Sequence, residues 1–241
     1  MPVLAFILLL FLSSSLYSQI PSSSRSKTAI KKVRPKLETR LASQKLAFGS
    51  PVHIRIFKES MELELWIKDK NSYVLFRTYE ICTYGSEGLG PKLKQGDGKA
   101  PEGFYKVYPH SLNPYSSFHL SFNLGYPNAY DRAHKRTGSA LMVHGSCCSI
   151  GCYAMTDESI EEIYALVDAA LRNGQKTVPV HIFPFRMTDS NLEDFRDWEW
   201  FSFWNMLKKG YDLFEDSFIP PRVEVKKGRY VFADEADQEK G

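Results

Sequence analysis

The segment HGSCCSIGCYAM, residues 144–155, gathers residue types that commonly carry out chemistry in proteins. One histidine and three of the chain's four cysteines lie within nine positions: His144, Cys147, Cys148 and Cys152. Thiolates and imidazoles bind zinc, pairs of thiols form disulfides, and a thiol beside an imidazole can act as a nucleophile with its base. The segment therefore offers three alternatives: a metal site, a disulfide, or a catalytic pair.

A zinc site fits this spacing poorly. Structural zinc sites usually draw two pairs of ligands from separate segments, and no second pair recurs elsewhere in the chain. The side chains of the adjacent Cys147 and Cys148 are also expected to point in different directions. We therefore expect no metal at this segment.

A disulfide between Cys82 and either Cys147 or Cys148 is reasonable in an oxidising compartment. Adjacent cysteines bridge only through a strained peptide, which argues against a bond between Cys147 and Cys148. If Cys152 is free, one of the other three cysteines is unpaired as well. One bridge with two thiols and an arrangement of four thiols both remain open.

A cysteine nucleophile needs a base and hydrogen-bond donors for an oxyanion. A strand that ends in LMVHG would place His144 at the edge of a sheet, and Gly145 would allow a sharp turn. Cys152 follows after a loop long enough to return beside the imidazole, and Gly151 lets the backbone approach a substrate closely. A helix that begins near Thr156 would favour the thiolate if Cys152 lies close to its N-terminus.

Short β-like segments must position these residues. Residues 52–58, 62–68 and 72–85 are alternating or rich in β-branched and aromatic side chains, which predicts an antiparallel meander. Six glycines and two prolines at 85–103 predict a long surface loop of the kind that often borders a site. Further strands are expected at 104–110, 116–125, 139–145 and 177–185.

Two helices are expected after the cysteine segment. Residues 156–174 place apolar side chains at i, i+3, i+4 and i+7, with Thr156 or Asp157 as N-cap. A second, aromatic-rich helix is expected at 191–210, and residues 222–232 could pair as a small hairpin. A doubly wound fold is disfavoured because strands do not alternate with helices in the first hundred residues. The pattern predicts an α+β, mostly β domain.

The N-terminal residues differ in composition from the rest. Residues 1–18 contain the apolar run VLAFILLLFL followed by small polar residues, which is typical of a signal peptide for export. An uncleaved N-terminal anchor is the alternative. Residues 19–45 hold eight basic side chains against Glu38 alone, and we expect a basic flexible linker there. The catalytic domain is then expected at 46–215 and a C-terminal extension at 216–241.

The basic residues indicate few partners by themselves. Because the whole chain carries +3 and the linker +7, the remaining residues carry −4. No aromatic residues are interleaved with the basic ones, so we expect no nucleic-acid binding. A basic linker could contact anionic lipid or polymer at a membrane, and a solvated tether is the alternative.

The pattern HG…S-x-G-C at 144–152 resembles the signature of the L,D-transpeptidase catalytic domain (YkuD-type). The resemblance extends to GDGKAPEGFYKV and to FHLSFNLGYPNAYDRAHKRTGSALMVHG, and it covers residues 50–185. Ala154 stands where the wider family often carries arginine. The CYAMT form is similar to the envelope murein-transpeptidase subgroup of YafK type.

This resemblance implies a β-sandwich-like sheet with helices packed on it, acyl transfer on peptidoglycan stem peptides, and no cofactor. Cys152 would be the nucleophile, and His144 would donate and accept the proton. The acceptor would be an amine of another stem peptide or of a peptidoglycan-linked lipoprotein, or water. By position, support for the substrate or the oxyanion would come from Gly145, Ser149, Gly151 and Tyr153.

Two other residues and several rival functions remain open. Arg132 could bind a substrate carboxylate, with a surface ion pair as the alternative. His119, in an expected strand, could line a groove or serve a structural role. Rival functions are a peptidoglycan amidase or hydrolase of the same fold and a non-catalytic cell-wall-binding protein. In each case we expect the protein in the periplasm or cell envelope.

Overall fold

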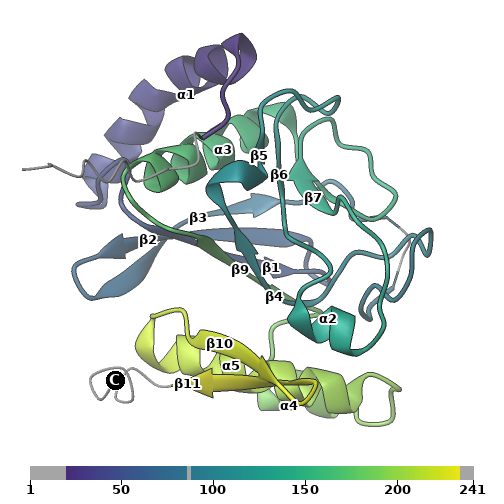
Figure 1. Cartoon of the computed structure of the whole chain (residues 1–241). Coiled ribbons are helices and arrows are strands. Elements are labelled where there is room, and N and C mark those ends of the chain that lie inside the picture. The colour runs from purple at the N-terminus through teal and green to yellow at the C-terminus, as the bar shows by residue number, and fades with distance from the viewer. Residues whose placement is uncertain (1–19, 86–87, 234–241) are drawn as a thin grey trace, which may run out of the picture.

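A five-stranded sheet forms the centre of the molecule in the computed structural model, which describes residues 20–85 and 88–233 (Figure 1). The expected signal peptide at 1–18 lies outside these residues. The strand order of the sheet is β3-β2-β1-β9-β4. The predicted meander is confirmed, because three strands pair antiparallel in succession: β1 Val52–Phe57, β2 Glu62–Asp69 and β3 Ser72–Glu80.

The other two strands of this sheet come from distant parts of the chain. Strand β9, Val178–Phe183, pairs parallel with β1. On its other side it pairs antiparallel with β4, Gly103–Val107. Strand β9 is thereby fixed next to β1, although more than a hundred residues separate them in the chain.

A smaller four-stranded sheet carries the cysteine segment. Its strands are β5 Leu112–Asn113, β6 Ser121–Asn123, β7 Met142–His144 and β8 Tyr153–Ala154. The strand predicted at 116–125 is therefore too long. His119 lies outside it with a φ of 63°, a left-handed conformation that an extended strand does not contain.

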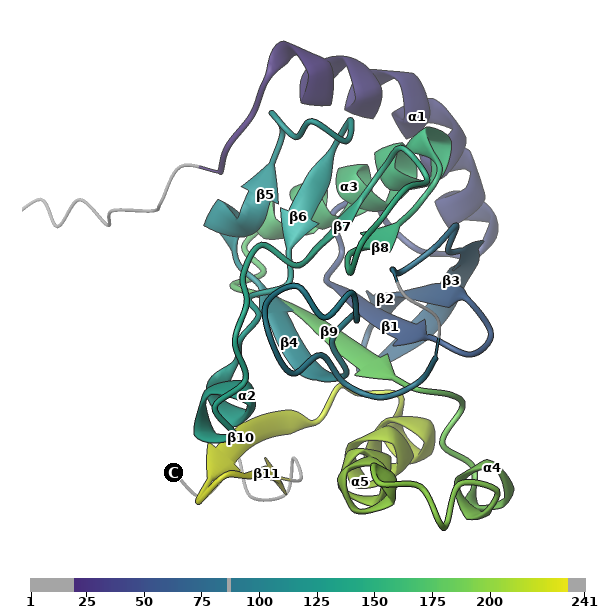
Figure 2. The same cartoon turned by 90° about the vertical axis from the view of Figure 1, so that its right-hand side faces the viewer.

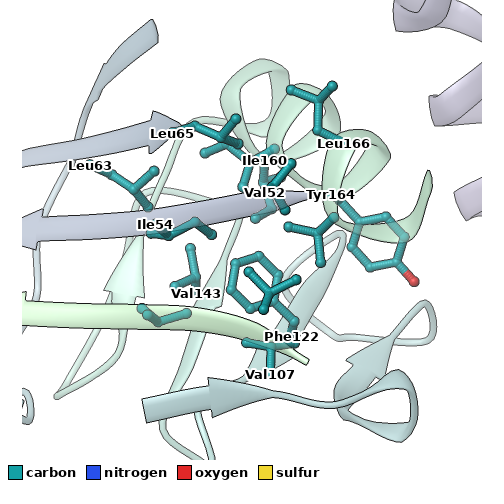
Figure 3. Packing of buried hydrophobic residues seen from close by; sticks show 14 of the residues in the cluster. Val52, Ile54, Leu63, Leu65, Val107, Phe122, Val143, Ile160, Tyr164 and Leu166 are labelled. Atoms are coloured by element: carbon teal, nitrogen blue, oxygen red, sulfur yellow. The ribbon is translucent and has the colours of Figure 1, made fainter. Parts of the chain in front are cut away.

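Both sheets share one hydrophobic core with helix α3, Asp157–Arg172. Figure 3 shows Val52 and Ile54 of β1 facing Ile160 of α3 and Val143 of β7. The predicted helix is confirmed: the Thr156 hydroxyl caps it by accepting a hydrogen bond from the Ser159 amide. The mixed sheet-and-helix architecture confirms the α+β prediction.

The expected flexible linker is wrong for residues 24–43, which form helix α1, Ser24–Ser43. A capping box at Ser23 and Ser26 starts the helix. Its side chains at every fourth position are buried against α3, as Figure 1 shows for the two helices: Ala29, Val33, Leu37 and Leu41. Burial of these four side chains orders a segment that, because of its many charges, we expected to be a flexible linker.

The opposite face of the five-stranded sheet is covered by the C-terminal elements (Figure 2). The helix predicted at 191–210 is two helices, α4 Asp189–Glu193 and α5 Phe201–Ser217, joined by turns at 194–200. Aromatic packing accounts for the interruption, since the Phe195 ring in this joint stacks on Phe185 with centroids 4.6 Å apart.

The C-terminal hairpin is confirmed. Strands β10, Arg222–Lys226, and β11, Arg229–Ala233, pair antiparallel. Lys227 and Gly228 form the turn with φ values of 50° and 70°, as a two-residue hairpin of this twist requires. Among the residues that the structure describes, no helix combines the length and hydrophobicity needed to span a bilayer.

Candidate active site

His144 ends strand β7 of the small sheet, and Cys152 immediately precedes the neighbouring strand β8. Strands β7 and β8 pair parallel, with His144 opposite Ala154, so the residue just before β8 comes beside β7 (Figure 2). The Sγ of Cys152 accepts a hydrogen bond from the Met142 amide at 3.4 Å, and its thiol donates to the Ala140 carbonyl oxygen at 3.6 Å. The loop of seven residues between His144 and Cys152 therefore returns to β7, the strand that ends in His144.

The Cys152 thiol is half-buried, and burial raises its pKa above the ordinary value. The Met142 amide and the positive charge of Lys92 oppose this rise without cancelling it. That the following helix favours the thiolate stays a prediction, since burial sets the net direction of this pKa shift. Desolvation exceeds the local positive potential, and the resting group at neutral pH is the thiol.

The His144 imidazole is buried, and burial lowers its pKa below 6.5. Its Nδ1 lies 2.6 Å from the carbonyl oxygen of Gly145. A carbonyl can only accept, so Nδ1 carries the hydrogen and Nε2 keeps a lone pair, as a general base requires. The Phe118 ring covers the imidazole with centroids 4.6 Å apart.

Ser149 shapes the turn that carries Cys152. Its Oγ accepts hydrogen bonds from the amides of Gly151, at 3.0 Å, and Cys152, at 2.7 Å, and donates to the Cys152 carbonyl oxygen. The amides of Gly151 and Cys152 thus converge on the serine hydroxyl in this structure. Gly151 has a φ of 146°, and a Cβ there would lie 3.2 Å from the Lys99 carbonyl oxygen.

Gly145 is required for space rather than for its dihedral angles. A Cβ at this position would lie 2.5 Å from a carboxylate oxygen of Asp157. That same oxygen accepts a hydrogen bond from the Ser146 amide at 2.8 Å. The first acidic residue of α3 therefore holds the turn that leaves β7.

A disulfide ties the connecting loop to the end of β3. Cys82 is bonded to Cys147, while Cys148 and Cys152 are free. Backbone hydrogen bonds support the same junction: the Cys82 amide donates to the Ala154 carbonyl oxygen at 2.8 Å, and the Cys147 amide to that of Met155 at 3.1 Å. Of the pairings left open by the sequence, the one with two free thiols is observed.

The cysteine segment does not assemble a metal site. Within residues 20–85 and 88–233, no three His, Cys, Asp or Glu side chains come together in a group that could hold a metal ion. Cys147 is engaged in the disulfide and Cys148 is exposed. The four candidate ligands therefore have different roles.

The glycine-rich loop packs against the turn that carries Cys152. A buried ion pair that we did not predict holds this loop in place. A Cβ at Gly85 would lie 2.6 Å from the Gly151 nitrogen, so this loop packs directly on the Cys152 turn. Lys58 and Glu102, both fully buried, pair at 2.9 Å. Lys58 also donates to the Gly90 carbonyl oxygen, and Glu102 accepts from the Gly90 amide.

The structure separates the remaining predicted site residues from the pair. Tyr153 is fully buried, and its hydroxyl donates to the Pro101 carbonyl oxygen at 2.8 Å.

Arg132 lies exposed on α2, Ala129–Ala133, and donates to the Pro127 carbonyl oxygen. It lines a cavity of about 770 Å³ beside β10, to which no residue of 144–155 contributes. His119 pairs with Glu161 at 3.0 Å.

Comparison with known proteins decides the family. The model of the L,D-transpeptidase catalytic domain matches residues 51–182, more than half of the chain. The chain belongs to the L,D-transpeptidase catalytic domain family. Residues 144–152, with the histidine and cysteine described above, lie inside the matched range.

Individual relatives agree with this L,D-transpeptidase assignment. The chain is 52% identical over 183 residues to the protein named "Putative L,D-transpeptidase YafK" in Escherichia coli K12, and equally to its counterpart in strain O157:H7. Each match covers 76% of this chain and 74% of the relative.

Two solved structures are more distant. The helical cell shape determining protein Pgp2 from Campylobacter jejuni is 16% identical, with a TM-score of 0.43 over 79% of this chain and 80% of that one. Bd1075 from Bdellovibrio bacteriovorus is 16% identical, with a TM-score of 0.42 over 73% and 77%.

Proposed function

We propose that this L,D-transpeptidase-family protein is an exported peptidoglycan L,D-transpeptidase with Cys152 as nucleophile and His144 as proton donor and acceptor. The observation that carries the proposal is the pairing of β7 with β8. It brings a half-buried thiol beside the strand that ends in an imidazole with a fixed tautomer. Family membership supports the reaction class. The apolar run at residues 3–12 supports export.

The reaction begins with a neutral pair. Because burial raises the pKa of Cys152 and lowers that of His144, thiol and imidazole are both uncharged at neutral pH. Nε2 of His144 takes the thiol proton as sulfur attacks the carbonyl carbon of the third stem-peptide residue. The imidazolium then protonates the amine of the terminal D-alanine. The carbon–nitrogen bond breaks, and a thioester remains on Cys152.

The second half of the reaction returns the enzyme to its starting state. An acceptor amine from another stem peptide, or from a peptidoglycan-linked lipoprotein, gives its proton to His144 and attacks the thioester carbonyl. The carbon–sulfur bond breaks, an amide forms, and the imidazolium reprotonates the thiolate. Water in place of the amine would give the hydrolase reaction from the same thioester.

Incubation with tetrapeptide muropeptides tests this proposal. The wild-type protein is expected to produce crosslinked dimers, detected by mass, that require Cys152. Cys152→Ala removes the nucleophile, and Cys148→Ser is the matched control, because it removes the neighbouring free thiol and should leave the yield unchanged. Shortened stems in place of dimers would make the protein a hydrolase. A wild-type protein that yields no Cys152-dependent product would overturn both reactions.

A further inference from the structure

The N-terminal helix reaches the proposed catalytic histidine through one loop. Residues 114–120 connect β5 to β6, and the start of α1 lies over this connection (Figure 2). Four side-chain hydrogen bonds join the two elements. Ser23 donates to the Pro114 carbonyl oxygen at 2.9 Å, and the Tyr115 hydroxyl donates to that of Ser22 at 3.0 Å. The other two come from Arg25.

Arg25 brackets the residue that covers the imidazole. Its Nη1 donates to the carbonyl oxygens of Ser116, at 2.7 Å, and His119, at 2.8 Å. Phe118 lies between these two carbonyls in the chain. Arg25 thus fixes the backbone two residues before and one residue after this phenylalanine, and the hydrogen bond between His119 Nε2 and Glu161 of α3 holds the same loop from the other side.

Phe118 contacts His144 in two ways. Its ring lies 4.6 Å from the imidazole at an interplanar angle of 31°. Its carbonyl oxygen accepts a hydrogen bond from the Gly145 amide at 3.1 Å, next to the carbonyl that fixes the imidazole tautomer. The phenylalanine ring is 44% exposed, so it forms an outer wall of the site rather than part of the core.

Arg25 is not needed to attach the helix. The buried stripe of α1 anchors it to α3 independently, and the arginine side chain itself is exposed. Because the Arg25 side chain donates hydrogen bonds to two carbonyl oxygens of the loop, it orders the loop rather than the helix. Helix α1 also lies outside the range 51–182 that the family model matches.

We propose that Arg25 is a positioning residue for the active site: through residues 114–120 it holds Phe118 against His144. The phenylalanine then keeps the imidazole ring in one orientation and water away from one of its faces. This inference rests on the proposed function of His144. The basic helix α1 then contributes to catalysis by ordering the loop that holds Phe118.

Four variants test the proposal: Arg25→Gln, Phe118→Ala, their combination, and Lys31→Gln as a control for an exposed charge on the same helix. Each single variant at 25 or 118 is expected to lower kcat roughly tenfold and to change KM by less than about twofold. Because both act through one contact, the double variant should also lose roughly tenfold rather than a hundredfold. Lys31→Gln should match the wild type.

The proton chemical shift of the His144 ring separates positioning from stability. The nearby phenylalanine ring shifts this resonance, and the displacement should be lost in both Arg25→Gln and Phe118→Ala. Retention of the wild-type shift and kcat in Arg25→Gln would overturn the inference. So would losses that multiply in the double variant, or a loss of kcat that follows the fraction of unfolded protein. If the wild type makes no Cys152-dependent product, the proposed function fails, and the ring shift alone still decides this inference.

Discussion

Buried histidines lie on both sides of the five-stranded sheet, in different surroundings. On the side of the small sheet, His144 of β7 has a carbonyl partner for Nδ1, an aromatic cover and a thiol just before the neighbouring strand. On the face toward α5, His53 and His181 pack with ring centroids 4.4 Å apart. Within the described residues, His53 Nε2 and His181 Nδ1 have no hydrogen-bond partner.

This difference teaches that burial of a histidine does not by itself make a catalytic site. All three imidazoles have lowered pKa values, with burial as the largest cause. The Nδ1 of His53 also has a carbonyl partner, the Pro179 oxygen at 3.1 Å, so His144 is set apart by the thiol that lies beside its strand. The pair on the other face is a neutral packing element, which Arg55 and Lys106 help to keep uncharged by repulsion.

The largest effect expected from this comparison is the loss of His144. His144→Ala should lower kcat about 10³-fold, since a general acid–base group contributes on that order. The thermal midpoint should change little by comparison. The matched variant on the other face, His181→Gln, should retain kcat and change the free energy of unfolding instead. Steady-state kinetics and thermal unfolding of both variants measure the contrast, and the reverse pattern would refute it.

Removal of the disulfide should affect both stability and rate. Cys82 and Cys147 lie 65 residues apart, and a loop of that length corresponds to about 4 kcal/mol of unfolding free energy. The double variant Cys82→Ser/Cys147→Ser also releases the loop that carries Cys152, so kcat should fall. Chemical denaturation measures the first effect, with Cys148→Ser as control. Equal stability of the two variants would contradict it.

Acid should destabilise the protein through the face that holds the histidine pair. The pKa of His53 is lowered to about 3 and that of His181 well below 6.5, so the folded state binds fewer protons than the unfolded chain. The stability that these two histidines contribute by staying neutral is therefore fully present above pH 6.5, and it falls as the pH drops below this value. Each histidine contributes up to about 1.4 kcal/mol per pH unit.

Denaturation curves at pH 7, 6 and 5 measure this slope. His181→Gln removes one of the two groups and should give a shallower dependence on pH. A wild-type stability that stays constant over this range would show that the pair is already protonated or solvated in the folded protein.

The smallest effect is expected at Arg132. This residue lies on α2 and lines the cavity beside β10, away from the cysteine segment. Arg132→Gln should change kcat and KM by less than about twofold, because a side chain acts on a reaction chiefly through contact or close charge. A large rise in KM for the donor peptide would instead assign the arginine to substrate binding.

Much of the fold could be predicted because several of its elements have a recognisable pattern in the local sequence. The meander, α3 and the hairpin each have a clear period or turn signal. Helix α1 was hidden by its charges and by Pro35, although Ala29, Val33, Leu37 and Leu41 recur every four residues. Residues 52–58 were predicted only as an alternating strand, and the structure adds that α5 also buries the polar side of β1, including Arg55 at 1% exposure.

The candidate pair could be predicted because both residues lie in one short segment. Their supporting groups could not, because these come from remote parts of the chain. Arg25 is 94 residues from His119, and Glu102 is 44 from Lys58. A local sequence pattern does not reveal such contacts, because they follow from the order of strands in the two sheets.

A thioester at Cys152 is the central intermediate of the proposed reaction, and intact-mass analysis tests it most directly. The wild-type protein, mixed briefly with a tetrapeptide donor and quenched in acid, should gain the mass of the donor less one D-alanine. Peptide mapping should place the adduct on the peptide that contains Cys152, and His144→Ala should slow its appearance about 10³-fold. An adduct on Cys148, or none while product accumulates, would contradict the central claim.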